Sequence, residues 1–336
     1  MSPGRVAFPE SLDPRVLAAA TELLGDGSCS EIALFGIPSH IKKVATEHGL
    51  DLDKFESRLR WINEGEDGLS TALSSRLLDQ ARAKGKELSA ASAQTASVHP
   101  LLRAGEMLYS GQTDAVVAGS VATTAEVIRA GISTVGLARG CRTVSGAFLM
   151  LRPECPGESE KILLFADCGV VVDPTSQQLC DIAWSTTLTW NQVIRSTFPD
   201  LIPRVAFLSF STKRSAEHPM VQKVQDAVAL FAKTHPEVEA DGELQLDAAL
   251  DLDVGRRKSP GSSVAGLANC LIFPNLDSGN ICYKTAQRLG GFEAIGPILQ
   301  GLAKPYCDLS RGASAHDIAM AARVNVLRAK APVIFT

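Results

Sequence analysis

The sequence predicts an α/β fold. Two observations carry this prediction: short apolar runs alternate along the chain with longer segments of helical period, and small polar residues gather where the apolar runs end. Such alternation is typical of sheets whose strands are joined by helices. The length of 336 residues is enough for two domains of this kind, or for one large one, with sizeable cores.

In the first half of the chain, strands are expected where the apolar run is short, and helices where apolar residues recur every three or four positions. The expected strands are RVAFP (5–9), EIALFGI (31–37), DAVVAGS (114–120) and TVSGAFLML (143–151). The expected helices are 67–85, 98–111 and 123–136. The same alternation continues in the second half, so a second set of α/β elements is expected there.

The second set begins with the apolar run KILLFADCGVVV. The expected strands are 161–172, RVAFLSF (204–210) and CLIFPN (270–275), with helices at 174–194 and 218–233. Two polar segments interrupt the pattern. RPECPGESE (152–160) is predicted to be a surface link between domains, and LDVGRRKSPGSSVAG (252–266) a long Gly/Ser-rich loop.

Composition excludes several classes of function. The chain is 45% hydrophobic and 21% charged with a net charge of −4, so it has no basic field for holding nucleic acid or an anionic membrane. No stretch approaches the roughly 20 apolar residues of a membrane span. The N-terminal segment MSPGRVAFPESLDPR lacks a signal pattern, so we expect a cytoplasmic protein. Its eight cysteines and six histidines are scattered without metal-ligand spacing, which predicts reduced thiols and no metal site.

Candidate binding loops follow the predicted strands, where α/β sheets place their ligands. They are rich in Ser, Thr, Gly and Asn and comprise 120–124, 209–215, 275–280 and 310–314. Arg129 and Arg288 follow two of them on the ensuing helices. Small hydroxyl residues with arginines at hand suit phosphoryl groups. The alternative is structural, with Thr123 or Thr124 as a helix cap and both arginines solvated.

The segment DLSRGASAHDI (308–318) combines two signals. Ser314 and Asp317 have the spacing of an N-cap residue and its capping acid, which predicts a helix start with a structural purpose. Ser310, Arg311 and the glycine after them precede that start, and a helix N-terminus favours anions. Both interpretations stay open for Asp317. A Walker loop, a dinucleotide-binding fingerprint and a nucleophile elbow are all missing from the sequence.

Five long segments in the same order resemble the phosphate acetyltransferases, which move an acetyl group between coenzyme A and inorganic phosphate. They are DAVVAGSVATTAEVIRAG, RVAFLSFSTKRSAEHP, DGELQLDAAL, VAGLANCLIFPNLDSGNICYKTAQRLGG and EAIGPILQGLAKPYCDLSRG. The resemblance covers nearly the whole chain and is densest in the last 130 residues. GLARGCRTVSGAFLML and FADCGVVVDPT look most like the short form that includes the ethanolamine-utilisation enzymes.

The resemblance implies two α/β/α domains with a cleft between them, similar to the isocitrate/isopropylmalate dehydrogenase fold. Residues 1–141 and 300–336 would form the first, discontinuous domain and residues 142–299 the second, with the active site in the cleft. It also implies a homodimer that acts on acetyl-coenzyme A, phosphate and acetyl phosphate. Coenzyme A would be a cosubstrate, and no cofactor would be tightly bound.

The family's functional residues transfer to this chain position by position. The resemblance implies Ser310, Arg311 and Asp317 as catalytic residues, Arg288 and Arg129 as phosphate-binding residues, and Arg129 and Arg82 as coenzyme A-binding residues. Thr124 is added to the expected phosphate-binding residues because it lies in the loop 120–124 after a predicted strand. Arg82 is offset by one position from the family's pattern. Two further departures are Ala313, where the family usually has cysteine, and Arg214, where it usually has glycine.

The implied chemistry is attack of the coenzyme A thiolate on the carbonyl of acetyl phosphate. Complete proton transfer from an ordinary thiol to an ordinary aspartate is uphill by roughly 6 kcal/mol, so we expect Asp317 to remove the proton in concert with attack. Arg311 and Arg288 would hold the phosphoryl oxygens, and Ser310 would stabilise the developing oxyanion. No acyl-enzyme is required. Two other hypotheses are a phosphate butyryltransferase and a non-catalytic relative that kept the fold.

Overall fold

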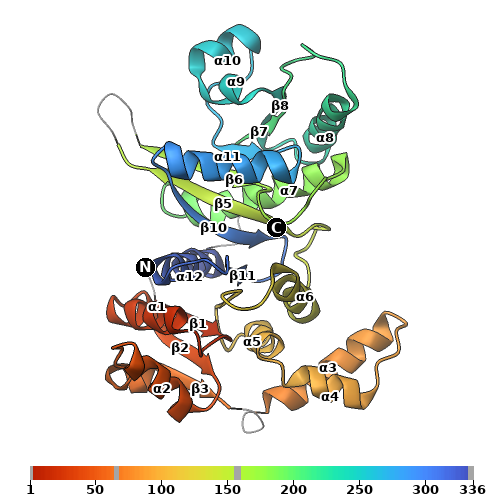
Figure 1. Ribbon diagram of the computed structural model, residues 1–336. Coiled ribbons are helices and arrows are strands. Elements are labelled where there is room, and N and C mark those ends of the chain that lie inside the picture. Colours follow the sequence, from red (N-terminus) through yellow and green to blue (C-terminus); the bar gives the residue numbers. More distant parts are fainter. Residues whose placement is uncertain (1–2, 64–67, 155–159, 332–336) are drawn as a thin grey trace. The chain divides into compact units, whose positions relative to one another are not determined.

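The computed structural model describes residues 3–63, 68–154 and 160–331, and it has the predicted α/β fold (Figure 1). The chain divides into two compact units. Unit 1 comprises Met1–Leu137 and Leu302–Lys330, and the main segment of unit 2 is Ala138–Gly301. The chain passes from one unit to the other at two adjacent places, since Leu137 and Leu302 pair as an isolated antiparallel bridge. None of the helices in the described residues is long and apolar enough to span a membrane.

Unit 1 contains a five-stranded sheet in which every neighbouring pair is parallel. Its strands, in the order β11-β4-β1-β2-β3, are Tyr306–Asp308, Ala115–Ala118, Gly4–Phe8, Cys29–Phe35 and Leu59–Ile62. Both faces are buried, as an all-parallel sheet requires. The strands β1, β2 and β4 are the ones that the apolar runs predict.

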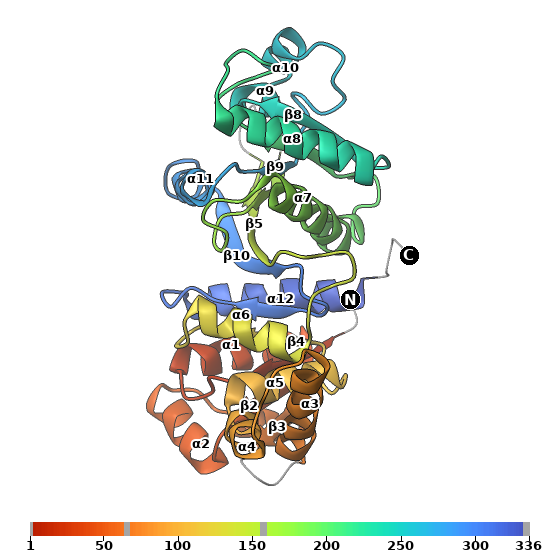
Figure 2. The same cartoon turned by 90° about the vertical axis from the view of Figure 1, so that its right-hand side faces the viewer.

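Helices cover both faces of this sheet (Figure 1). On one face are α1 (Pro14–Gly25), α2 (Pro38–Glu47) and α12 (Ala315–Lys330), whose apolar side chains share a core with those of the strands. On the other face are α5 (Pro100–Tyr109) and α6 (Thr124–Thr134), which lie in front of the sheet in Figure 2. The pair α3 (Leu69–Ala83) and α4 (Ala90–Ser97) packs side by side and projects from the sheet, in orange in Figure 1. A short 3₁₀ helix, Asp53–Arg58, precedes β3.

Three connections of unit 1 meet at one edge of the sheet. The strands β11, β4 and β1 are neighbours and parallel, so their carboxyl ends lie side by side. Each leads directly into a helix: β1 into α1, β4 into α6 and β11 into α12. This is the edge at which open α/β sheets bind ligands. Residues 9–13, 119–123 and 309–314 are therefore brought together from distant parts of the chain.

Unit 2 contains a six-stranded mixed sheet in the order β10-β5-β6-β9-β7-β8. In that order the strands are Glu293–Gln300, Ser145–Arg152, Lys161–Ala166, Cys270–Ile272, Arg204–Leu208 and Glu239–Leu244. The pairs β10–β5 and β5–β6 are antiparallel, and the rest are parallel. Helices α7 (Ser176–Trp190, continued by a π turn to Arg195) and α8 (Pro219–Thr234) pack on one face. Helices α9 (Leu246–Leu250) and α11 (Leu276–Leu289) pack on the other.

Three expectations about unit 2 were wrong. Segment 152–160 joins the antiparallel strands β5 and β6 within unit 2, so it does not link the units; its residues 155–159 lie outside the described part. The strand predicted at 161–172 ends at Ala166, because the Asp167 carboxylate accepts N–H bonds from Gly169, Val170 and Val171 and turns the chain. The loop predicted at 252–266 begins as helix α10 (Leu252–Lys258), which the Asp251 side chain caps at the Val254 N–H (2.8 Å).

Candidate active site

An open pocket of about 580 Å³ lies at the carboxyl edge of the unit 1 sheet, between the start of α6 and the loop before α12. Its lining residues are Ala122, Thr123, Thr124, Ala125, Leu309, Ser310 and Arg311. Three of the predicted site residues, Thr124, Ser310 and Arg311, are thus brought together from positions far apart in the sequence. The N–H groups of the first turn of a helix have no partner within it. In α6 the Glu126 N–H is bonded to the Thr123 hydroxyl, so the donors without a partner among the described residues are the N–H groups of Thr124 and Ala125.

The loop that leads into α6 wraps around a carboxylate from the β1–α1 connection. Glu10 Oε2 accepts hydrogen bonds from the N–H groups of Gly119 (2.7 Å) and Ser120 (2.8 Å), and Oε1 from those of Val121 (3.0 Å) and Ala122 (2.6 Å). Gly119 has φ +102°, and a Cβ there would lie 2.4 Å from a carboxylate oxygen of Asp308. Four backbone donors therefore fix the loop on one internal anion. Sequence reasoning did not identify Glu10, because its partners are more than 100 residues away.

Thr123 and Thr124 have different roles at the start of α6. Thr123 is the N-cap residue, and it forms a reciprocal capping box with Glu126. Thr124 donates its hydroxyl proton to Asp308 Oδ2 at 2.7 Å. The structural interpretation of Thr123 is therefore confirmed. The Thr124 hydroxyl can then only accept a hydrogen bond, so the one donor that Thr124 can offer a ligand is its backbone N–H.

Asp308, the last residue of β11, is a second residue that sequence reasoning missed. It is 1% exposed, and its Oδ1 has no hydrogen-bond partner among the described residues. Burial raises the pKa of this carboxyl to about 6, and the nearby charge of Glu10 acts in the same direction. Asp308 thus ties the end of β11 to α6 through Thr124, one residue before the pocket residue Leu309.

The loop before α12 is held by its own polar groups. Ser310 Oγ accepts a hydrogen bond from the Gly312 N–H (3.3 Å), and the Ser310 carbonyl accepts one from the Ala313 N–H (2.9 Å). Ser314 and Asp317 form a capping box: Asp317 Oδ2 accepts from the Ser314 N–H and hydroxyl, each at 2.8 Å, and the Asp317 N–H donates to Ser314 Oγ at 3.2 Å. The capping interpretation of Asp317 is therefore confirmed.

Capping uses only part of the Asp317 side chain. Oδ1 receives no hydrogen bond in the described part of the chain, and the residue is exposed. Ser310 and Arg311 are exposed as well. One carboxylate oxygen is thus committed to the helix start and the other has no partner among the described residues, although Asp317 is not one of the residues that line the pocket.

The remaining predicted arginines do not line this pocket. Arg129 lies on α6, exposed, little more than one turn after Thr124. Arg82 lies in the last turn of the projecting helix α3, where its guanidinium is 3.6 Å from the exposed Asp79 carboxylate. Arg288 is exposed in the last turn of α11 in unit 2. Their binding roles remain predictions.

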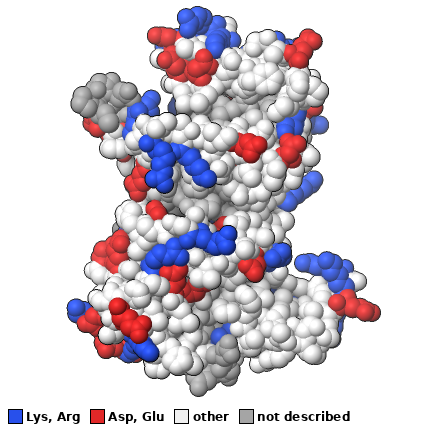
Figure 3. Space-filling view, in the orientation of Figure 1, with Lys and Arg blue, Asp and Glu red and all other residues white. Residues whose placement is uncertain are grey.

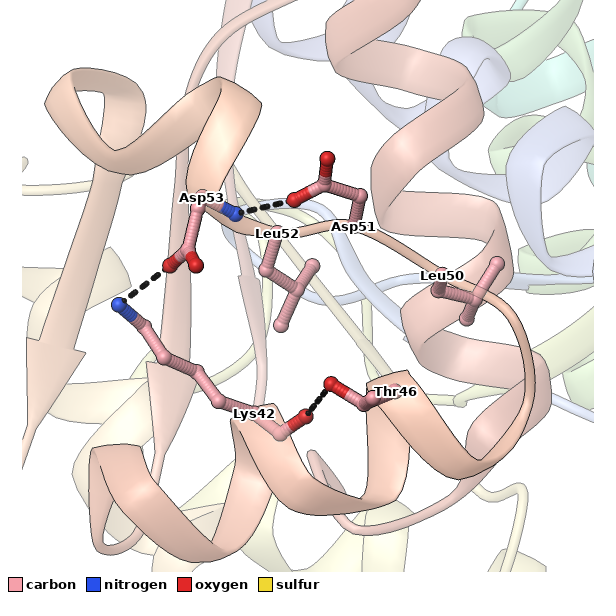
Figure 4. Close-up of a pocket in the computed structure, with 6 residues that line it drawn as sticks. All are labelled: Lys42, Thr46, Leu50, Asp51, Leu52 and Asp53. Carbon is pink, nitrogen blue, oxygen red and sulfur yellow. Dashed lines mark hydrogen bonds and ion pairs between the residues drawn. The ribbon is translucent and has the colours of Figure 1, made fainter.

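A second pocket of unit 1, about 260 Å³, offers a poorer site. It lies between α2 and the 3₁₀ helix and is lined by Lys42, Thr46 and residues 50–53 (Figure 4). Its only cation, the Lys42 ammonium, lies 2.8 Å from carboxylate oxygens of both Asp53 and Glu56. The charge is therefore already compensated.

The surface and the metal-binding groups add two observations. Basic and acidic side chains are interspersed over the visible face of each unit (Figure 3), in keeping with the small net charge. Among the described residues, no group of three or more His, Cys, Asp or Glu side chains is placed to hold a metal ion.

Comparison with known proteins identifies the family. The family model for phosphate acetyl/butaryl transferase matches residues 2–326. The chain belongs to this family. A phosphate acetyltransferase of Clostridium acetobutylicum is 41% identical over 97% of this chain and 94% of that protein. Among solved structures, EutD phosphotransacetylase from Staphylococcus aureus is 32% identical with a TM-score of 0.84, and a phosphotransacetylase from Streptococcus pyogenes is 35% identical with a TM-score of 0.84. Each match covers 97% of this chain and 94% of the other.

These matches confirm the resemblance to the phosphate acetyltransferases, including the likeness to the ethanolamine-utilisation branch. They also confirm the α/β fold class. Of the residues that the family's motifs placed at the site, Ser310 and Arg311 line one pocket of this structure, together with Thr124.

Proposed function

We propose that this protein is a phosphate acetyltransferase, which reversibly transfers an acetyl group between coenzyme A and inorganic phosphate. The observation that supports it best is the pocket of unit 1, where Arg311 and Ser310 lie beside the first turn of α6. An arginine fork together with free backbone donors suits a phosphoryl group. The full-length similarity to phosphate acetyltransferases supports acetyl as the acyl group. Coenzyme A acts as a cosubstrate in a cytoplasmic homodimer.

Each site residue has a proposed role. Arg311 holds the phosphoryl oxygens of acetyl phosphate, and Ser310 stabilises the negative charge that develops on the carbonyl oxygen. The N–H groups at the start of α6, including that of Thr124, bind the phosphoryl group from the other side of the pocket. The positive charges of Arg288 and Arg129 further attract the phosphoryl group. Arg129 and Arg82 bind coenzyme A.

Asp317 is the proposed general base. Its free Oδ1 accepts the thiol proton of coenzyme A, while Oδ2 stays bonded to Ser314. The sulfur attacks the acetyl carbonyl, and phosphate leaves with the electron pair of the broken C–O bond. The proton moves in concert with attack, because the neutral thiol is a poor nucleophile and a concerted step does not require a free thiolate to form first. The Ser314 bonds keep the carboxylate at a fixed orientation while this happens.

The transfer is direct, without an acyl-enzyme. No cysteine lines the pocket, and the position where the family usually has one is Ala313. The thiol nearest in sequence, Cys307, is buried, and burial raises its pKa to about 12. Such a thiol supplies almost no thiolate near neutral pH, so it is a poor nucleophile.

The test is a phosphate-dependent thiol assay with acetyl-, propionyl- and butyryl-coenzyme A. The proposal expects coenzyme A release that requires phosphate and has its highest kcat/KM with the acetyl thioester. A clear preference for the four-carbon thioester would reassign the protein as a phosphate butyryltransferase. Folded protein that releases no coenzyme A with any of the three would reveal a non-catalytic relative.

A further inference from the structure

Arg15 connects the two loops of the proposed active site from outside the pocket. It is the second residue of α1, and the Asp13 side chain caps that helix by accepting the Arg15 N–H at 2.9 Å. The β1–α1 connection places both residues at the carboxyl edge of the sheet, beside the connections that follow β4 and β11. Neither residue lines the pocket.

The Arg15 guanidinium donates to three backbone carbonyls of these loops. Nη1 donates to the carbonyls of Arg311 and Ala313, both at 2.8 Å, and Nη2 donates to that of Ser120 at 3.1 Å. The two contacts of Nη1 span the turn that carries Arg311 and Gly312. The contact of Nη2 reaches the loop that Glu10 also holds.

Asp13 fixes the guanidinium in this orientation. Its Oδ2 lies 2.6 Å from Arg15 Nη2 and its Oδ1 lies 3.1 Å from Nε, so the pair is bidentate. The Asp13 side chain is only 6% exposed, and the Arg15 hydrogen bonds lower the pKa of its carboxyl in spite of the burial that opposes them. The carboxylate therefore stays charged, and the planar fork has one favoured position.

We propose that Arg15, oriented by Asp13, is a positioning residue for catalysis. It sets the backbone conformation of the turn that presents Ser310 and Arg311, and it sets the distance between that turn and the loop that precedes α6. This inference rests on the proposed function. In the proposed reaction Arg15 touches no reacting atom, and it acts through the carbonyls of Arg311 and Ala313. Misplacement of a substrate-holding group by about 1 Å can lower the rate by a factor on the order of 100.

The chain offers a matched control in Arg5. Its guanidinium also pairs with an aspartate through two nitrogens, with Nη2 2.7 Å from Asp114 Oδ1 and Nε 3.4 Å from Oδ2, and it also donates to a backbone carbonyl, that of Gly111 (3.0 Å). The two arginine side chains are similarly exposed, 40% for Arg5 and 34% for Arg15. Arg5 lies at the amino end of β1 and Asp114 just before β4, at the opposite edge of the same sheet.

The experiment compares Arg15→Lys with Arg5→Lys in the full chain, by kcat, by KM for acetyl-coenzyme A and phosphate, and by melting temperature. Lysine keeps the charge but cannot bridge an aspartate and three carbonyls with a planar fork. Arg15→Lys should lower kcat about 10- to 100-fold, with a loss of melting temperature no larger than that of Arg5→Lys. Arg5→Lys should keep kcat within about twofold of the wild type.

Rescue provides a second measurement. Guanidinium added to Arg15→Ala should restore part of kcat, whereas ammonium at the same concentration should not, because only the former has the forked donors. Unchanged kcat in Arg15→Lys, equal losses of kcat in both lysine variants, or an unfolded Arg15→Lys would each overturn the positioning role. A wild-type protein without phosphate-dependent coenzyme A release would instead refute the proposed function, whatever the variants do.

Discussion

Replacing Asp317 by Asn separates catalysis from helix capping, because the structure defines what capping alone is worth. The contacts from Oδ2 to the Ser314 N–H and hydroxyl are both 2.8 Å, and an amide oxygen can accept both. The lost negative charge at a helix N-terminus costs about 0.3–1 kcal/mol. For a domain of this size that corresponds to at most about 2–4 °C in melting temperature. As the base, Asp317 contributes about 10²–10⁴-fold to kcat.

Glu126 is the control for this experiment, since it caps α6 in the same way. Glu126 Oε2 accepts from the Thr123 N–H (2.8 Å) and hydroxyl (2.7 Å), but the residue has no proposed chemistry. Asp317→Asn and Glu126→Gln should therefore lower the melting temperature by similar small amounts, while only Asp317→Asn lowers kcat about 10²–10⁴-fold. The assay is phosphate-dependent coenzyme A release with melting curves on the same samples. Near wild-type kcat in Asp317→Asn would refute the assignment of the base.

Three further predictions follow from individual side chains. Arg311→Lys keeps the charge but loses the fork, so kcat should fall about tenfold or more without unfolding, as measured by steady-state kinetics and melting curves; unchanged kcat would contradict the phosphoryl contact. The pKa of Asp308 is raised to about 6, so between about pH 4 and pH 6 the folded chain holds a proton that the unfolded chain releases. The free energy of unfolding therefore falls as the pH rises through that window, by up to about 3 kcal/mol, and stays lower above it. In urea unfolding, the stability of Asp308→Asn relative to the wild type should therefore increase from pH 4 to pH 7. A difference in free energy of unfolding that stays constant with pH would contradict the prediction. Arg214 has φ +66°, so Arg214→Gly should raise the free energy of unfolding by about 0.5–1 kcal/mol, and a loss of stability would show that its side chain outweighs the strain.

Local pattern was sufficient for most of the fold that positions the site. The segments VAF of β1, IALF of β2 and AVVA of β4 are apolar and buried without a break, as in buried parallel strands, so they are visible as apolar runs. Two strands of unit 1, β3 and β11, were not visible in that way. β3 is LRWI, where the charged Arg60 interrupts the run, and β11 is YCD, three residues that end in a buried aspartate. Their pairing partners, β2 and β4, make them strands, and pairing across the chain leaves no local signal.

The residues of the candidate site likewise fall into those that the sequence could predict and those that it could not. Ser310, Arg311 and Thr124 could be predicted because each lies in a strand-to-helix connection with a recognisable motif. Glu10, Arg15 and Asp308 could not be predicted as site residues, because their contacts join segments more than 100 residues apart. In the sequence, Asp13 and Arg15 are ordinary residues at the start of a helix. Only the order β11-β4-β1 of the sheet brings them to the loops that they hold.

Phosphate-dependent acetyl transfer predicts a fixed stoichiometry of the two products. The purified protein is incubated with acetyl-coenzyme A, with and without phosphate, and free coenzyme A and acetyl phosphate are quantified in the same samples. We predict equimolar amounts of the two products with phosphate, and neither product without it. Coenzyme A released at the same rate without phosphate, or released without matching acetyl phosphate, would contradict phosphate-dependent acetyl transfer.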